Sequence, residues 1–241
     1  MTDLTPRLLP YGDQALLVEF GNRVERAVSE RILALDEEIA GSGLAGLRET
    51  VPAFRSLLVK FDPLETAFSE VAAAIEHLLS KTGSVAAEGR TFKVPVCYDG
   101  DFAPDLDDIA ARVGLDREAV IQAHSSVTYH CYMIGFVAGC PYLGDMPEAL
   151  ALPRRADPRT RIPDRSVAIA MRQTVIYPLV SPGGWHLIGK TPIRIFDLAW
   201  PEPALFKPGD KILFDRISAS DFERIERDLE ANGGKLKPMT G

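Results

Sequence analysis

One short, proline-rich segment of this sequence contains four arginines in a stretch of eight residues. Arg154, Arg155, Arg159 and Arg161 are spread through PRRADPRTRIP, residues 153–163. A guanidinium group binds phosphate or carboxylate through two parallel hydrogen bonds, so the segment could face an anionic ligand. The alternative is a solvated loop whose arginines pair with the chain's own carboxylates. In either case the repeated prolines predict a segment without regular secondary structure.

A second stretch that could do chemistry runs from 176 to 197, IYPLVSPGGWHLIGKTPIRIFD. Two apolar runs, 176–180 and 185–188, flank SPGG at 181–184, and this pattern predicts two strands joined by a tight turn. A second turn at 189–192 should lead into a further strand at 193–196. The glycines could bring bare backbone N–H groups to a ligand, with Trp185 as a wall. An ordinary hairpin with a core tryptophan would show the same pattern.

A third candidate is His124, at the end of a predicted helix over 117–124. Its ordinary pKa near 6.5 suits acid or base chemistry. The helix dipole also favours a protonated histidine at a helix C-terminus, so a capping or core role is the alternative. Cys140 is an unpromising nucleophile, because no histidine lies beside it in the sequence.

Composition limits the classes of function that these residues can serve. The chain has 241 residues, 46% of them hydrophobic and 25% charged, with a net charge of -7. An acidic chain without a basic patch is not expected to bind nucleic acid. The start of the sequence does not resemble a signal peptide, and no apolar run is long enough to span a membrane. Three irregularly spaced cysteines are typical of reduced thiols in the cytoplasm, and no CxxC or HExxH pattern predicts a metal site.

The elements that must position these residues follow from periodicity. We predict a small α+β domain over residues 1–88, with strands at 7–20, 47–53 and 55–61 and helices at 24–40 and 64–79. Residues 81–90 (KTGSVAAEGR) are predicted to be the linker. A β-rich domain over 89–241 should contain strands at 91–98, 128–136, 166–170 and 211–215. Two short helices at 106–113 and 117–124 and a C-terminal helix after residue 220 complete it.

Several segments in this order resemble one protein family, which includes the B subunit of 5-oxoprolinase, allophanate hydrolase subunit 1 and KipI. The segments that carry the resemblance are VPAFRSLLVKFDP (51–63), VPVCYDG (94–100), PDLDDIAARVGL (104–115), GFVAGCPYLG (135–144), LPRRADPRTRIP (152–163), SVAIA (166–170), QTVIYPLVSPGGWHLIGKTP (173–192) and KPGDKILF (207–214). The resemblance implies that the second domain is a cyclophilin-like β-barrel.

The resemblance also implies a function that needs a partner. The expected partner is a second protein of the same complex, similar to the C subunit of 5-oxoprolinase or to allophanate hydrolase subunit 2. The complex would use ATP with Mg²⁺ to open the lactam of 5-oxo-L-proline to L-glutamate. One alternative is the carboxyltransferase part of a biotin-dependent urea carboxylase, in which a partner would carry the biotin, because this chain has no biotin-acceptor motif. A KipI-like inhibitor of a histidine kinase is another. The chain has no P-loop, so we expect it to be inactive alone.

Opening a lactam requires cations for phosphate, donors for a developing oxyanion, and a wall for the small ring. Under the resemblance we expect His124 and Arg159 to be catalytic and no metal to be bound by this chain. The residues expected to bind the substrate are Phe136, Tyr142, Arg154, Arg161, Gln173, Tyr177, Gly183, Gly184 and Trp185. Gln173 and Tyr177 could instead lie on the solvent face of a strand.

Four residues depart from the family pattern in these loops. Ala138 and Cys140 stand where the family has proline and an aromatic residue, and Arg165 and Met171 stand where it has glycine. Arg165 could add a contact to an anion or block the usual substrate. An enzyme subunit should show a polar, arginine-lined site, whereas an interaction module should show a featureless apolar face. The retained arginine segment and SPGGW motif favour the enzyme.

Overall fold

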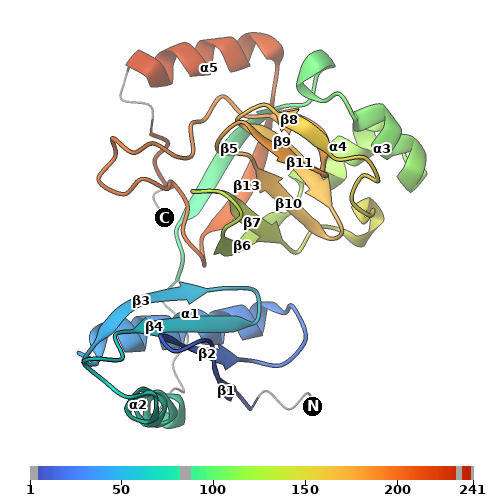
Figure 1. Cartoon of the computed structure of the whole chain (residues 1–241). Coiled ribbons are helices and arrows are strands. Elements are labelled where there is room, and N and C mark those ends of the chain that lie inside the picture. The colour runs from blue at the N-terminus through green and yellow to red at the C-terminus, as the bar shows by residue number, and fades with distance from the viewer. Residues whose placement is uncertain (1–4, 82–87, 232–234, 240–241) are drawn as a thin grey trace. The chain divides into compact units, whose positions relative to one another are not determined.

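The computed structural model describes residues 5–81, 88–231 and 235–239, and it divides into two compact units, Met1–Glu88 and Gly89–Gly241 (Figure 1). Residues 82–87, where most of the expected linker falls, lie outside the described residues.

The first unit is a four-stranded antiparallel sheet with two helices. The strands β1 (Arg7–Pro10), β2 (Ala15–Glu19), β3 (Leu47–Pro52) and β4 (Ser56–Phe61) lie in the order β1-β2-β4-β3. The helices α1 (Arg26–Gly41) and α2 (Phe68–Lys81) pack on the same face, because their apolar stripes share one core with alternate residues of β2 and β4.

The helix expected from residue 64 begins four residues later, at Phe68. The reason is a turn around Asp62, whose carboxylate accepts the Leu64 N–H at 2.9 Å while its backbone carbonyl accepts the Thr66 N–H. Glu70 then accepts the Ala67 N–H at 2.9 Å, which satisfies a donor at the true start of the helix. Side chains of this kind compete locally with helical hydrogen bonds.

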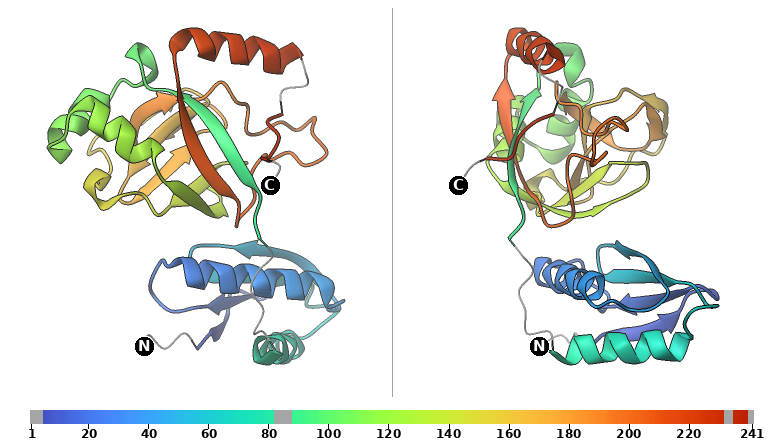
Figure 2. Two further views of the ribbon diagram at one scale, coloured as in Figure 1. Left: turned by 180° about the vertical axis from the view of Figure 1, so that it is seen from behind. Right: turned by 90° about the vertical axis from the view of Figure 1, so that its left-hand side faces the viewer.

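The predicted barrel is confirmed as a closed, seven-stranded one. Its order is β10-β7-β6-β13-β5-β12-β9, and every neighbouring pair is antiparallel except β5 with β13 (Figures 1 and 2). The strand bounds are β5 (Thr91–Cys97), β6 (Thr128–Ile134), β7 (Pro141–Gly144), β9 (Ser166–Ala170), β10 (Gln173–Ile176), β12 (His186–Lys190) and β13 (Lys211–Ile217). Closure leaves none of these strands with an unpaired edge.

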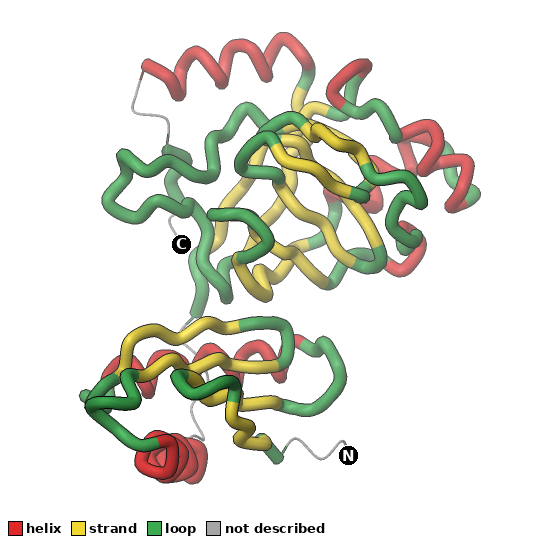
Figure 3. Tube along the Cα trace, viewed as in Figure 1, coloured by secondary structure: helices red, strands yellow, loops and turns green. Residues whose placement is uncertain are grey.

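Helices and long loops surround the barrel (Figure 3). The α-helices of this unit are α3 (Leu106–Val113), α4 (Arg117–Ser125) and α5 (Ala219–Ala231), and single 3-10 turns lie at Gly100–Phe102 and Glu148–Leu150. Asp116 caps α4 as its sequence predicts, accepting the Ala119 N–H at 2.7 Å.

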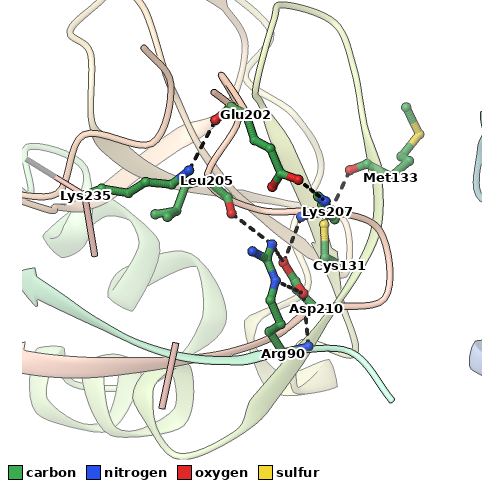
Figure 4. Close-up of polar contacts among 8 residues, drawn as sticks. All are labelled: Arg90, Cys131, Met133, Glu202, Leu205, Lys207, Asp210 and Lys235. Carbon is green, nitrogen blue, oxygen red and sulfur yellow. Dashed lines mark hydrogen bonds and ion pairs between the residues drawn. The ribbon is translucent and has the colours of Figure 1, made fainter. Parts of the chain in front are cut away.

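A partly buried ion pair joins the start of β5 to the turn before β13 (Figure 4). The Asp210 side chain, 2% exposed, accepts hydrogen bonds from the Arg90 guanidinium at 2.6 and 3.1 Å and from the Arg90 backbone N–H at 3.1 Å. It also accepts the Lys207 N–H at 2.8 Å. A side chain at Gly89 would overlap the Gly209 carbonyl, so only glycine permits this approach. The pair therefore fixes the parallel seam of the barrel.

Alternate residues of β9 and β10 face two different apolar clusters. Val167, Ile169 and Ile176 point into the barrel interior. Ala168, Ala170 and Val175 point outward into a smaller cluster, which we call the outer cluster. Its buried members are Cys140, Ile162, Ala168, Ala170, Val175, Tyr177, Trp185 and Leu187, with Val137 and Tyr142 packed against them.

The arrangement between β10 and β12 differs from the predicted hairpin. These two strands lie on opposite sides of β9, so a tight turn cannot connect them. Residues 181–183 form instead a strand, β11 (Ser181–Gly183), that pairs with β8 (Arg159–Ile162) in a separate two-stranded ribbon. The expected turn at 189–192 is wrong as well, because Gly189 and Lys190 belong to β12. No regular strand forms at 193–196, where Phe196 makes one isolated bridge to Ala204.

Candidate functional site

The arginine segment and the SPGGW motif meet in the β8–β11 ribbon. The expectation that repeated prolines keep 153–163 free of regular structure is wrong for β8, where Ser181 pairs with Ile162 and Gly183 with Arg159. The prolines stand outside the strand, so they remove none of its ladder hydrogen bonds. The loop before β8 is held by the Arg155 N–H, which donates to the Gly184 carbonyl at 2.8 Å.

Three aromatic side chains gather where this ribbon covers the outer cluster. Trp185 is 5% exposed and Tyr177 2% exposed, while Tyr142 is half-buried. The Tyr142 ring meets Trp185 edge-on, with centroids 5.9 Å apart. The Arg154 guanidinium lies 5.6 Å from the centroid of the Trp185 ring, within the range of a cation–π contact. The structure therefore brings together four residues predicted to bind the substrate.

Gly183 is required by packing against Tyr177. A Cβ atom at Gly183 would overlap the Tyr177 hydroxyl and lie 2.8 Å from Cδ1 of Ile162. Gly184 has open surroundings, with its nearest neighbours 3.7 Å from such an atom. The two glycines therefore have different roles. Gly183 leaves space for the Tyr177 hydroxyl, and the carbonyl of Gly184 accepts the Arg155 N–H.

Burial keeps the titratable groups of the outer cluster protonated. It raises the pKa of Tyr177 and of Tyr142, and the nearby Cys140 raises both further, whereas Arg154 acts in the opposite direction. Burial also raises the pKa of Cys140 to about 12. Both phenols can therefore donate a hydrogen bond at neutral pH, while Cys140 is a thiol and a poor nucleophile.

His124 lies in the core of the barrel and not at a surface that a substrate could reach. It is 0% exposed and stacks on Phe214 with ring centroids 4.6 Å apart. Its Nδ1 lies 2.8 Å from the Tyr98 hydroxyl and its Nε2 lies 3.1 Å from Oγ1 of Thr174. Of the roles that the sequence left open, these contacts support the core role, and the assignment of His124 to catalysis stays a prediction.

The hydrogen bonds of this core cluster fix one tautomer. The Thr174 hydroxyl donates to the Ala168 carbonyl at 3.1 Å, so it can only accept from His124. Nε2 therefore carries the proton, and Nδ1 accepts from Tyr98. Burial lowers the pKa of His124 to about 3, so the ring is neutral.

Arg159 is engaged by Asp105, a residue that the sequence analysis did not identify. Its two terminal nitrogens lie 2.9 and 2.6 Å from the two oxygens of Asp105, which is 5% exposed. Arg155 approaches the same carboxylate at 3.4 Å. Of the two alternatives for this segment, pairing with the chain's own carboxylate holds for Arg159 in this structure, and its catalytic role stays a prediction. Arg161 is exposed on β8.

Two of the four departures from the family pattern lie at backbone positions that favour glycine. Arg165 and Met171 both have left-handed φ values, 62° and 56°, where glycine would be unstrained. The Arg165 guanidinium pairs with Glu226 of α5 at 2.5 Å, and its expected effect on an anion or on the substrate stays a prediction. Ala138 is exposed in the 135–140 loop.

Two expected substrate-binding residues have weaker structural support. Phe136 is 62% exposed, with a left-handed φ of 69°, and it lies outside the apolar clusters. Gln173 is half-buried at the first position of β10. It shares the face of that strand with Val175, so it lies on the side of the outer cluster.

Within the described residues, no group of three or more His, Cys, Asp or Glu side chains could hold a metal ion. In the same part of the chain, no helix is long and apolar enough to cross a membrane.

Comparison with known proteins assigns this barrel and its flanking ribbon to a carboxyltransferase-domain family. The chain belongs to the family described as carboxyltransferase domain, subdomain C and D, whose model matches residues 6–206. The predicted resemblance is confirmed, because the B subunit of 5-oxoprolinase from Bacillus subtilis (strain 168) is 36% identical over 228 residues. That match covers 90% of this chain and 95% of the relative.

Solved structures share the fold. The crystal structure of the protein TTHA0988 has a TM-score of 0.78 at 36% identity, covering 86% of this chain and 41% of that one. The present chain thus spans about two fifths of the TTHA0988 chain. The Kluyveromyces lactis urea amidolyase has a TM-score of 0.74 at 21% identity, covering 99% of this chain and 16% of that one, which shows the fold alone.

Proposed function

We propose that this chain is one component of an ATP-dependent 5-oxoprolinase complex, which opens the lactam of 5-oxo-L-proline to L-glutamate. The observation that carries the proposal is the similarity to the B subunit of 5-oxoprolinase over nine tenths of the chain. Two further curated proteins, from Escherichia coli O157:H7 and Haemophilus influenzae, have the same name. The activity requires a second subunit, and the chain is inactive alone.

The outer cluster supports this proposal through the chemistry of its side chains. The half-buried phenol of Tyr142 is protonated and can donate to the amide oxygen of a lactam at the edge of the outer cluster, where the nearly buried Trp185 and Tyr177 form an apolar floor. Arg154 adds a positive charge on the same face, which favours an oxygen that becomes negative. ATP, bound with Mg²⁺ in the assembled complex, would supply the phosphoryl group that makes the lactam carbon electrophilic.

The experiment compares the chain alone with the chain co-purified with a partner similar to the C subunit of 5-oxoprolinase. Each preparation receives 5-oxo-L-proline, ATP and Mg²⁺, and L-glutamate and ADP are measured. We expect both products from the complex and neither from the chain alone. Full turnover by the isolated chain would contradict the need for a partner. A stable complex without turnover would contradict the proposal that 5-oxo-L-proline is the substrate.

Carboxyl transfer is the second candidate function, because the matching family model carries that description. Carboxyl transfer would require bicarbonate and a biotin-bearing partner, and avidin would abolish this activity. Adding avidin to the active complex therefore separates the two reactions. The proposed 5-oxoprolinase should be insensitive to avidin.

A further inference from the structure

Asp105 joins three segments that are far apart in the sequence. It lies immediately before α3, and its carboxylate accepts both terminal nitrogens of Arg159 on β8. One of its oxygens also accepts the Leu187 N–H of β12 at 2.7 Å. Its backbone N–H donates to the Leu187 carbonyl at 3.1 Å, so Asp105 binds both polar groups of one β12 residue.

The residues beside these contacts are those of the candidate site. Arg155, which approaches Asp105 at 3.4 Å, follows Arg154, the residue that lies over Trp185. Leu187 is two residues after Trp185 on the same segment. Asp105 therefore holds both the segment that carries the cation and the segment that carries the indole.

Two other contacts join the same segments but do not replace Asp105. The imidazole Nε2 of His186 lies 3.0 Å from the Pro153 carbonyl, and the Arg155 N–H donates to the Gly184 carbonyl. Both hold the backbone on either side of Arg154, and Asp105 adds contacts to the side chains of Arg155 and Arg159. At the far end, β8 is held by the β11 ladder, by the burial of Ile162 in the outer cluster and by the Asp105–Arg159 pair.

We propose that Asp105 is a positioning residue, which sets where the Arg154 guanidinium lies relative to the Trp185 ring by anchoring the arginine segment to β12. It touches the reacting groups only through other residues. Its effect on turnover rests on the proposed function, whereas its effect on the geometry of the site does not.

The charge balance at Asp105 fits this role. Burial opposes its ionisation, but the hydrogen bonds from Arg159 and Leu187 and the charges of Arg159 and Arg155 together hold its pKa below the usual range. A permanently charged carboxylate accepting a forked guanidinium is a stiff, directional contact. Displacement of a substrate-positioning group by about 1 Å can cost a factor on the order of 10² in rate.

The test uses Asp105→Asn, which keeps the shape of the side chain and removes its charge. Asp107→Asn is the matched control: it lies on the first turn of α3 and pairs with Arg117 at 2.7 Å, but its side chain is 77% exposed. Both substitutions are made with Trp200→Phe, so that tryptophan fluorescence reports Trp185 alone.

We expect Asp105→Asn to shift the Trp185 emission to longer wavelength and to increase its quenching by acrylamide, while Asp107→Asn changes neither. In the assembled complex, without the Trp200 substitution, Asp105→Asn should lower kcat/KM for 5-oxo-L-proline on the order of 10²-fold. Its KM should rise, which a smaller folded fraction would not cause. Arg159→Lys, which retains the charge but loses the fork, should give an intermediate change in both measurements.

Unchanged Trp185 fluorescence in folded Asp105→Asn and in Arg159→Lys would overturn the proposal. So would equal effects of the Asp105 and Asp107 substitutions. If Asp105→Asn does not fold, Arg159→Lys alone decides, by the same fluorescence readout. A wild-type complex that opens no lactam would refute the proposed function instead, and the fluorescence comparison would still test Asp105.

Discussion

Replacing His124 by alanine should destabilise the barrel without a specific loss of catalysis. The substitution removes a fully buried ring that stacks on Phe214, and it leaves the Tyr98 hydroxyl without its partner. Truncating a large buried ring to alanine costs about 3–5 kcal/mol. An unsatisfied buried hydroxyl adds about 1–3 kcal/mol where no water can replace the lost contact. We therefore expect a loss of at least about 3 kcal/mol in the free energy of unfolding.

The same residue predicts how the stability of the barrel depends on pH. His124 has a pKa of about 3 in the folded chain, below the ordinary value of 6.5. As the pH falls below 6.5 the unfolded chain binds the proton and the folded chain does not, so stability falls until the pH reaches the folded pKa. One pKa unit corresponds to about 1.36 kcal/mol, so this histidine alone should cost about 2 kcal/mol between pH 7 and pH 5.

The assay is urea unfolding at pH 7 and pH 5, followed by tryptophan fluorescence. Both tryptophans, Trp185 and Trp200, belong to the barrel unit, so the signal reports that unit. The drop in stability between the two pH values should be about 2 kcal/mol smaller in His124→Ala than in the wild type. His77→Ala, which removes an exposed histidine of α2, should behave like the wild type. A His124→Ala variant with unchanged stability and greatly reduced turnover of the complex would refute this reasoning and return the residue to catalysis.

Arg159→Ala should lower the free energy of unfolding by about 3 kcal/mol, because it leaves the buried Asp105 carboxylate with Arg155, at 3.4 Å, as its remaining cation. Full stability with a roughly 10²-fold loss of turnover in the complex would show instead that Arg159 contacts the substrate. Gly183→Ala should cost about 1–3 kcal/mol through overlap with Tyr177, and Tyr177→Phe in the same chain should recover part of that loss in chemical denaturation. Met171→Gly should raise the melting temperature, by the equivalent of about 0.5 kcal/mol, since Met171 has a left-handed φ and is largely exposed; an unchanged melting temperature would count against backbone strain there.

Local pattern alone was sufficient for most of the elements. The spacing of apolar residues in 26–41 is that of a helix, and their alternation in 56–61 is that of a strand. In both elements the apolar residues form one face, and the structure buries that face. The helices at 106–113 and 117–125 also follow from the sequence, because Gly114 and Asp116 are local stop and start signals. Motif order identified the family, since it is a property of the sequence and does not require coordinates.

Pairing between distant segments was decided only by the tertiary structure. The apolar runs around SPGG have the same local pattern in a hairpin as in two strands separated by β9, so the sequence could not choose between them. His124 has helix-end chemistry in the sequence, but closure of the barrel places Tyr98 and Thr174 on its ring nitrogens. Asp105 gives no local signal, because its partner Arg159 is 54 residues away. Burial and charge pairing depend on which segments meet in space, and that information enters only with the fold.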